Sequence, residues 1–305
     1  HVLSKNELNK TSPNDYLFLT TKDTKYKNLL EILIEFKGKI VLLLDDHLFS
    51  TYKVINEIIE QIGPQRIKSA SIASVRENPF FMSMPLSQIK ETTIGWPISE
   101  RFSLKKDFSN RLNRVLALGV LTYRQFNKEI MTKLLDDRLN CVHPDREYLY
   151  HNHYCSKYID SKIPMRDYRF KDDGYLNNFI KRVYNKYNTM KYFKIDLPEI
   201  MNNYKFVMFP SMFDESPCLG MLEAMASGSI LIGTNAYAYK SLGLVENYNY
   251  ISIGEKMDVK LIDSIVDDQF KNNDKYISIQ KKSLDWVEQF KKSSFLEKFD
   301  LKDIL

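Results

Sequence analysis

Runs of apolar residues alternate with amphipathic segments over the first 75 residues of the chain. The stretch 39–44 is almost wholly apolar, which is typical of a strand buried on both faces. Residues 26–36 carry apolar side chains three and four positions apart, which is the spacing of an amphipathic helix. On these grounds the sequence predicts strands over 15–20, 39–44 and 67–75, and helices over 26–36 and 51–62. Strands that alternate with helices predict a parallel sheet wrapped by helices.

An irregular segment rich in Pro and Ser, residues 76–110, interrupts the alternation, and a new strand is then predicted over 114–119. We place a domain boundary near residue 105, which gives two α/β domains, residues 1–105 and 106–305. A chain of 305 residues exceeds the usual size of a single core, which agrees with two domains. In the second domain the pattern predicts helices over 125–136, 174–188, 198–203, 219–226, 258–270 and 276–305, and strands over 205–210, 229–233 and up to residue 253.

The amino-acid composition and the net charge limit the kinds of protein that this chain can be. The chain is 44% hydrophobic and 27% charged, as ordinary globular proteins are. It has neither a membrane-spanning apolar run nor an N-terminal signal pattern. The net charge of +5 is mild and comes without a dense Lys/Arg block, so nucleic acid is not the expected partner. An anionic small molecule suits this charge, which also allows peripheral contact with an acidic membrane. Three cysteines fit a reducing cytoplasm better than a disulfide framework.

The most informative segment is Asp214-Glu-Ser-Pro-Cys-Leu-Gly-Met-Leu-Glu-Ala-Met-Ala-Ser-Gly228. Glu215 and Glu223 lie on either side of the start of the helix predicted over 219–226, and Gly228 is placed to end that helix in the left-handed conformation. The helix begins just past a buried strand, where α/β sheets bind ligands. Its first backbone N–H groups have no intrahelical partner and suit a phosphate.

This segment resembles the E-x7-E signature of retaining GT-B glycosyltransferases. The resemblance implies two Rossmann-like domains with the active site in the cleft between them. It implies that Glu215 contacts sugar hydroxyls, that Glu223 contacts the ribose, and that the amides of Cys218, Leu219 and Gly220, after Pro217, hold the diphosphate. The alternative is an ordinary βαβ unit that carries two Glu residues, in which Gly220 serves only helix–sheet packing.

The resemblance extends to three further residues. His47 follows a predicted strand, where the family has a histidine that faces the transferred sugar, and the alternative is a loop histidine that caps the next helix. Arg124 and Lys128 lie where the family neutralises the diphosphate, although the family's Gly-Arg pair is Gly119-Val120 here, and the alternative is a pair of solvated charges. The N-terminal domain is shorter than the family's, so we expect it to be reduced. The final helix resembles the family's terminal helix, which crosses back to that domain.

Two arrangements could instead indicate a metal site. Asp45 and Asp46 are adjacent, so their carboxylates point to opposite sides of an extended chain and make a poor metal site. A second group has the residue types that zinc binds, although its spacing matches no established zinc signature. On a strand, His151, His153 and Cys155 would share one face. The group is Cys141, His143, His151, His153 and Cys155.

The resemblance therefore implies a hexosyltransferase that requires no metal. Its donor would be a UDP- or GDP-linked sugar, and its acceptor a hydroxyl of a glycan, a lipid or a protein-linked sugar. Retention of configuration and a role in polysaccharide biosynthesis are implied by the resemblance, and no cofactor is expected. We expect the protein in the cytoplasm, with peripheral membrane contact allowed. The alternatives are a non-catalytic nucleotide-sugar-binding module and a zinc-stabilised interaction protein.

Overall fold

The structure is a computed structural model, and it describes part of the chain. The described residues are 7, 10–21, 23–25, 28–44, 48–118, 145, 148–149, 152–161, 196–209 and 216–294. They divide into two compact units between Trp96 and Pro97, and each unit is described by itself.

The division lies earlier in the chain than the boundary expected near residue 105, because the segment after Trp96 bonds to the second unit. Ile98 N donates to Phe290 O at 2.7 Å, and Lys292 N donates to Ile98 O at 3.0 Å. Farther along, Lys105 N donates to Asn202 Oδ1 at 2.8 Å. The segment from Pro97 onward therefore belongs to the second unit.

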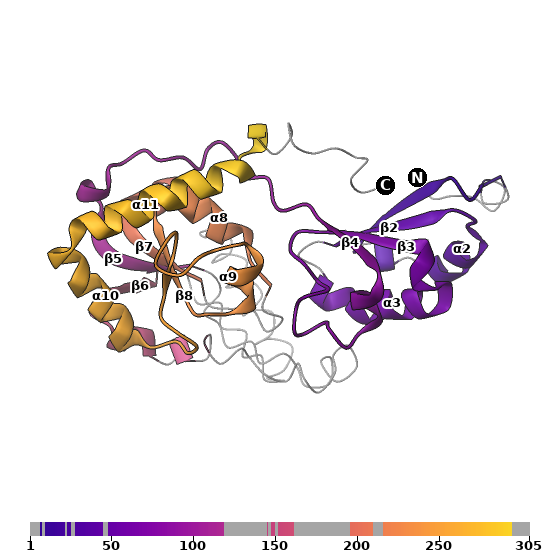
Figure 1. Ribbon diagram of the computed structural model, residues 1–305, viewed down its shortest axis with the longest axis horizontal. Coiled ribbons are helices and arrows are strands. Elements are labelled where there is room, and N and C mark those ends of the chain that lie inside the picture. Colours follow the sequence, from indigo (N-terminus) through magenta and orange to yellow (C-terminus); the bar gives the residue numbers. More distant parts are fainter. Residues whose placement is uncertain are drawn as a thin grey trace, which may run out of the picture. The chain divides into compact units, whose positions relative to one another are not determined.

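The first unit contains a parallel sheet in the order β1-β2-β3-β4. Its strands are β1 (Tyr16–Thr20), β2 (Lys39–Leu44), β3 (Ile67–Ser71) and β4 (Lys90–Thr93), and its helices are α2 (Leu29–Glu35) and α3 (Leu48–Ile62). Right-handed crossovers between strands in sequential order place both helices on one face of the sheet (Figure 1). Buried side chains such as Leu33, Ile40 and Ile59 form the core on that face. The predicted strands 15–20 and 39–44 are thus confirmed, and the helices predicted over 26–36 and 51–62 are present as α2 and α3, which begin at Leu29 and Leu48.

Strand β3 is shorter than the stretch 67–75 predicted for it. It ends at Ser71, because the following residues turn toward the carboxylate of Glu91. Ser74 Oγ donates to Glu91 Oε2 at 2.9 Å, and Val75 N donates to Glu91 Oε1 at 2.7 Å. Glu91 belongs to β4, a polar strand at the edge of the sheet that the hydrophobic pattern did not predict.

The second unit contains a parallel sheet in the order β6-β5-β7-β8-β9. The chain passes from β5 outward to β6 and then returns to β7 on the other side of β5. The strand order therefore reverses between β5 and β7, and the carboxyl ends of those strands are where such sheets bind ligands. The strands are β5 (Leu112–Ala117), β6 (Ile159–Ser161), β7 (Tyr204–Met208), β8 (Ile230–Gly233) and β9 (Ile251–Ser252).

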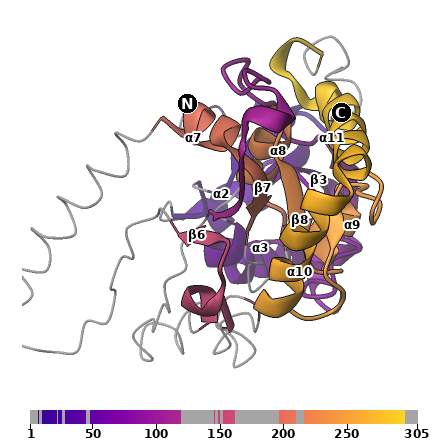
Figure 2. The same cartoon turned by 90° about the vertical axis from the view of Figure 1, so that its left-hand side faces the viewer.

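The helices of this unit pack around its sheet. Helices α10 and α11 follow one another and run in different directions over one face of it (Figures 1 and 2). Their apolar residues, including Ile262, Val266 and Ile279, share a buried cluster with Phe206 of β7 and Ile230 of β8. The helices are α7 (Leu197–Asn203), α8 (Leu219–Ala226), α9 (Tyr237–Ser241), α10 (Val259–Lys271) and α11 (Asn273–Val287).

The final helix predicted over 276–305 is confirmed up to Val287, but its continuity is wrong. Helix α11 ends at Val287, a 3-10 turn covers Glu288–Phe290, and Lys291 then pairs with Ile98 in a parallel bridge. That bridge needs extended backbone, which a continuous helix could not supply. The helices predicted over 125–136 and 174–188, and any crossover after residue 294, lie outside the described residues.

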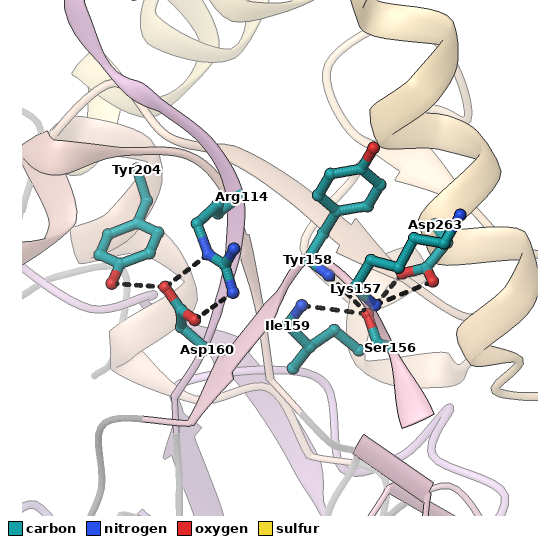
Figure 3. A network of polar contacts seen from close by, with 8 residues as sticks. All are labelled: Arg114, Ser156, Lys157, Tyr158, Ile159, Asp160, Tyr204 and Asp263. Atoms are coloured by element: carbon teal, nitrogen blue, oxygen red, sulfur yellow. Dashed lines mark hydrogen bonds and ion pairs between the residues drawn. The ribbon is translucent and has the colours of Figure 1, made fainter. Parts of the chain in front are cut away.

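A network of polar contacts joins three strands of the second sheet (Figure 3). Arg114 of β5 binds Asp160 of β6 through two hydrogen bonds, Nε to Oδ2 at 2.8 Å and Nη2 to Oδ1 at 2.6 Å. Tyr204, the first residue of β7, donates from its hydroxyl to Asp160 Oδ2 at 3.0 Å. Burial and this bond raise the pKa of Tyr204 to about 12. Tyr204 is the first residue of β7, whereas Asp160 pairs with Leu116 near the carboxyl end of β5, so the network spans the three strands along their length.

Among the described helices, none combines the length and the apolar character that a bilayer crossing requires.

Candidate functional site

Helix α8 begins beside the carboxyl end of β7. It runs over Leu219–Ala226, as predicted, and Cys218 precedes it in an extended conformation. Leu118, just after β5, donates from its N–H to Met208 O at 3.0 Å, so the ends of β5 and β7 adjoin. The start of α8 therefore lies at the carboxyl edge of the sheet, where the strand order reverses. Its first N–H groups have no partner within the helix and can bind an anion.

Gly220 lets the start of α8 approach Phe209, the residue that follows β7. A Cβ atom at position 220 would lie 2.6 Å from Phe209 Cε1 and 2.9 Å from Cζ. Real Cβ atoms do not come that close to a ring, so position 220 requires glycine unless the ring moves. This contact gives Gly220 a packing role, and the same contact holds the first turn of α8 against the end of the strand.

Gly228 ends α8 in the left-handed conformation, as predicted. Gly228 has φ +82°, and its N–H donates to Met225 O at 2.9 Å while Ser229 N donates to Ala224 O at 3.0 Å. These two bonds form a Schellman motif, which satisfies carbonyl groups that the helix leaves unpaired.

A buried arginine also bonds to the end of α8. Arg111, 5% exposed, donates from Nη2 to Ser227 O at 2.7 Å and from Nε to Lys106 O at 2.9 Å. Nη2 also donates to Asn202 Oδ1 at 3.0 Å. Burial lowers the pKa of Arg111 to about 10, so the side chain stays charged at neutral pH. A positive charge beside the carboxyl end of a helix is favourable.

Glu223 lies one turn into α8 and is partly buried. Burial raises the pKa of its carboxyl group, and the positive charge of Arg101 opposes that shift. The Arg101 guanidinium lies 4.7 Å from the centre of the Phe102 ring. Arg101 belongs to the segment that Ile98 joins to the second unit, so both charges lie within that unit.

Five of the predicted site residues lie within the described part of the chain, and their roles stay predictions: Pro217, Cys218, Leu219, Gly220 and Glu223. Pro217 is buried, and the next three are partly exposed. Four other predicted residues, His47, Arg124, Lys128 and Glu215, lie outside the described residues, and their roles stay predictions.

Sequence reasoning missed Tyr239 of α9 as a neighbour of this site. Its hydroxyl donates to Phe209 O at 3.2 Å, and its ring stacks on Tyr250 with the centroids 5.3 Å apart. Burial raises the pKa of Tyr239, so the hydroxyl stays protonated and continues to donate. Because Phe209 starts the connection from β7 to α8, Tyr239 positions the beginning of the loop that leads to the site.

Asp145 was missed as well. This buried carboxylate accepts from Thr234 Oγ1 at 3.1 Å and from Met257 N at 3.2 Å. Thr234 directly follows β8, so Asp145 holds the chain at the carboxyl end of the next strand. No local motif marks this pair, since its members lie 89 positions apart in the sequence.

The zinc arrangement does not have the predicted geometry where the structure describes it. Residues His153–Cys155 form a 3-10 turn and not a strand, so the predicted alignment on one strand face is wrong for His153 and Cys155. His153 Nδ1 lies 2.9 Å from Leu149 O. Within the described ranges no three metal-ligating side chains gather at one point. Asp45, Asp46, Cys141, His143 and His151 lie outside those ranges.

Comparisons with known proteins agree with this architecture. No family model matches the sequence, and no curated protein matches it. HepE of Anabaena, solved in complex with UDP-glucose, matches with a TM-score of 0.56 at 11% identity, over 93% of this chain and 77% of that one. The sucrose-phosphate synthase of Thermosynechococcus elongatus matches with a TM-score of 0.55 at 10% identity, over 92% of this chain and 71% of that one. Both are GT-B glycosyltransferases. The chain therefore has an α/β fold of the GT-B type, with two Rossmann-like units.

Proposed function

We propose that the chain is a glycosyltransferase that binds a nucleotide-diphosphate sugar at the start of α8 and transfers its hexose to a hydroxyl acceptor. The observation that carries the proposal is the position of α8 within a GT-B fold. The helix starts at the carboxyl edge where the strand order reverses, and Glu223 lies one turn beyond that start. HepE, which shares the fold, was solved with UDP-glucose, and this supports a nucleotide sugar as the donor.

The proposed roles follow the chemistry of the donor. The N–H groups of Cys218, Leu219 and Gly220 would bind the diphosphate at the helix start. The ionised carboxylate of Glu223 would accept hydrogen bonds from the ribose hydroxyls, and Glu215 would do the same for the sugar. Arg124 or Lys128 would stabilise the negative charge that grows on the diphosphate as it leaves, which lowers the barrier because that charge is greatest in the transition state. His47 would contact the transferred sugar.

The finer features of the reaction are part of the same proposal. We propose transfer with retention, without a metal or other cofactor, from a UDP- or GDP-linked hexose. The acceptor would be a glycan, a glycolipid or a protein-linked sugar, in polysaccharide biosynthesis. The reaction would take place in the cytoplasm, either free or peripherally at a membrane.

Calorimetric titration of UDP into the wild type and a Glu223→Gln variant tests the ribose assignment. Loss of a hydrogen bond to a charged group costs about 1.5–3 kcal/mol, so we expect UDP to bind roughly 10- to 100-fold more weakly to the variant. The same substitution at the exposed Glu199 of α7 is the matched control and should leave binding unchanged. A second titration uses 2′,3′-dideoxy-UDP, which lacks the ribose hydroxyls that Glu223 would bind. This nucleotide should therefore bind equally to wild type and Glu223→Gln. Equal UDP binding by wild type and Glu223→Gln would overturn the assignment.

Transfer itself needs a separate assay. Release of UDP or GDP from donor sugars, with and without hydroxyl acceptors, should show turnover by the wild type. Nucleotide-sugar binding that survives with neither transfer nor hydrolysis for any donor would favour a non-catalytic binding module. Zinc analysis of the purified protein tests the remaining alternative, since a zinc-stabilised protein must retain about one equivalent of the metal.

A further inference from the structure

The second unit has a cavity at the outer edge of β9, the strand at one end of its sheet. Its volume is about 240 Å³. It opens between the loop before β9, helix α10 and the first turn of α11. Its walls are formed by Asn247, Ile251, Ser252, Leu261, Ser264, Ile265, Asp268, Lys275 and Tyr276. None of these residues belongs to α8 or to the loop before it, so the cavity is distinct from the proposed donor site.

One wall holds a carboxylate in a set orientation. Asp268 accepts hydrogen bonds from Asn272 Nδ2 at 2.6 Å, Tyr276 Oη at 2.9 Å and Lys275 Nζ at 3.1 Å. The first of these bonds is the largest cause of a lowered pKa for Asp268, so the group is ionised at neutral pH. A carboxylate held by three donors needs little further ordering to accept a hydrogen bond from a ligand.

The opposite wall supplies backbone and amide groups. In a parallel sheet, successive residues of a strand form their backbone hydrogen bonds alternately with the strands on its two sides. Ile253 of this segment bonds toward β8, because its N–H donates to Gly233 O. The N–H and C=O of Ser252 therefore point away from β8, toward the outer edge where the cavity lies. In the described part of the chain no strand pairs with that edge. Asn247 adds a side-chain amide, and its backbone is left-handed with φ +55°.

Apolar surface lies between these polar groups. Leu261 is exposed at 41% and supplies most of this surface, because Ile251 and Tyr276 are almost fully buried. Leu261, Ser264 and Asp268 follow one another at three- and four-residue spacing, so they lie along one face of α10. The cavity thus presents hydroxyl, amide and carboxylate groups around an apolar patch.

We propose that this cavity binds one neutral sugar unit of a glycan. A pyranose has hydroxyl groups that donate and accept around a ring with an apolar C–H face, and the cavity offers partners for both. Lys275 and Asp268 are the charged side chains on its walls and they pair with each other, so neither an anion nor a cation finds an uncompensated partner. The volume lies below the roughly 300–1,000 Å³ of sites for drug-sized ligands, which suits a single sugar.

A peptide fits this edge less well. Strand β9 has two residues, and strand addition depends on a longer run of main-chain hydrogen bonds. The inference goes beyond the proposed transferase reaction, because sugar binding here involves no residue of the donor site. The site would hold a distant unit of a glycan, and its occupancy can be measured without any nucleotide.

NMR titration of the whole protein with methyl α-glucoside, methyl α-galactoside and N-acetylglucosamine tests the proposal. Amide resonances of Asn247, Ser252 and Ser264 should shift with at least one neutral sugar at up to about 50 mM, a range that covers millimolar dissociation constants. Glucose 6-phosphate should shift them less, and UDP should leave them unchanged. Since UDP binding is measured separately, failure here and failure of the transferase proposal are distinguishable.

Two variants assign the shifts to the cavity. Asn247→Gly removes the amide and keeps a residue that tolerates positive φ, so we expect about 3- to 10-fold weaker sugar binding without loss of the fold. Ser264→Ala, at an exposed position of α10, should weaken binding similarly. The matched control is Asn28→Gly, since Asn28 has φ +65° and lies in the first unit, and it should bind like wild type. The proposal is overturned if no neutral sugar shifts these resonances, or if both cavity variants bind like wild type.

Discussion

Arg111 Nη2 donates a 2.7 Å hydrogen bond to the carbonyl of Ser227, the residue that caps the carboxyl end of α8. The same side chain reaches Lys106 O and Asn202 Oδ1, so it joins α8 to α7 and to the segment before β5. Because α8 has only eight residues, its orientation depends strongly on what holds its ends. The position of the candidate site therefore depends on a buried cation at the opposite end of the same helix.

Replacing Arg111 with Met should destabilise the second unit. The substitution leaves buried carbonyl groups without a donor, and we expect a loss of about 2–4 kcal/mol in the free energy of unfolding. Urea unfolding followed by circular dichroism measures this loss. Arg76→Met, at an exposed position of the first unit, is the matched control and should change stability by less than about 0.5 kcal/mol. A variant of Arg111 as stable as the control would show that the buried hydrogen bonds contribute little.

The sequence predicts α8 correctly because the determinants of this helix are local. Leu219 to Ala226 are good helix formers, and Gly228 ends the helix through its own left-handed backbone. Strand β4 could not be predicted in the same way, because Lys90-Glu-Thr-Thr93 carries no hydrophobic signal and becomes a strand by pairing with β3. The three-residue strand β6 likewise depends on β5.

The same distinction applies to the candidate site. Gly220 and Glu223 belong to one local motif, so the sequence singles them out as candidates, whereas Tyr239 bonds to a residue 30 positions away and is revealed only by the fold. The pairing of Asp145 with Thr234 is of the same kind. Local spacing also misjudged His153 and Cys155, because a strand was assumed where the chain forms a 3-10 turn.

Gly220→Ala should destabilise the protein, although alanine is normally favoured over glycine in helices by about 1 kcal/mol. The added Cβ would collide with the Phe209 ring, and we expect a net loss of about 1–3 kcal/mol. Thermal unfolding of the single variants Gly220→Ala and Phe209→Leu and of the double variant forms a mutant cycle. The cycle should show favourable coupling, since the smaller side chain makes room for the methyl group. Additive effects would mean that the two positions do not interact.

Tyr239→Phe should weaken the start of the loop from β7 to α8. The variant keeps the stacked ring and removes only the hydroxyl that donates to Phe209 O, so we expect a loss of about 0.5–1.5 kcal/mol in stability. If the bond positions the proposed donor site, affinity for UDP-glucose should fall as well at a temperature where the variant is fully folded. Tyr154→Phe, at a side chain that is 75% exposed, is the control and should alter neither quantity. Lower stability with unchanged UDP-glucose affinity would limit Tyr239 to a structural role.

The affinity for UDP-glucose should depend on pH through Glu223. Burial raises the pKa of this carboxyl group, so on lowering the pH it becomes protonated earlier than an ordinary glutamate and ceases to be a charged acceptor for the ribose. Affinity for UDP-glucose should therefore be full above the raised pKa and fall as the pH drops through it.

Arg101 opposes the upward shift in the pKa of Glu223, so Arg101→Gln should move the fall in affinity to higher pH. Calorimetric titration between about pH 4.5 and 8 measures both curves, with Arg76→Gln as the control that should follow the wild type. A curve for Arg101→Gln that coincides with the wild type would show that Arg101 does not tune Glu223.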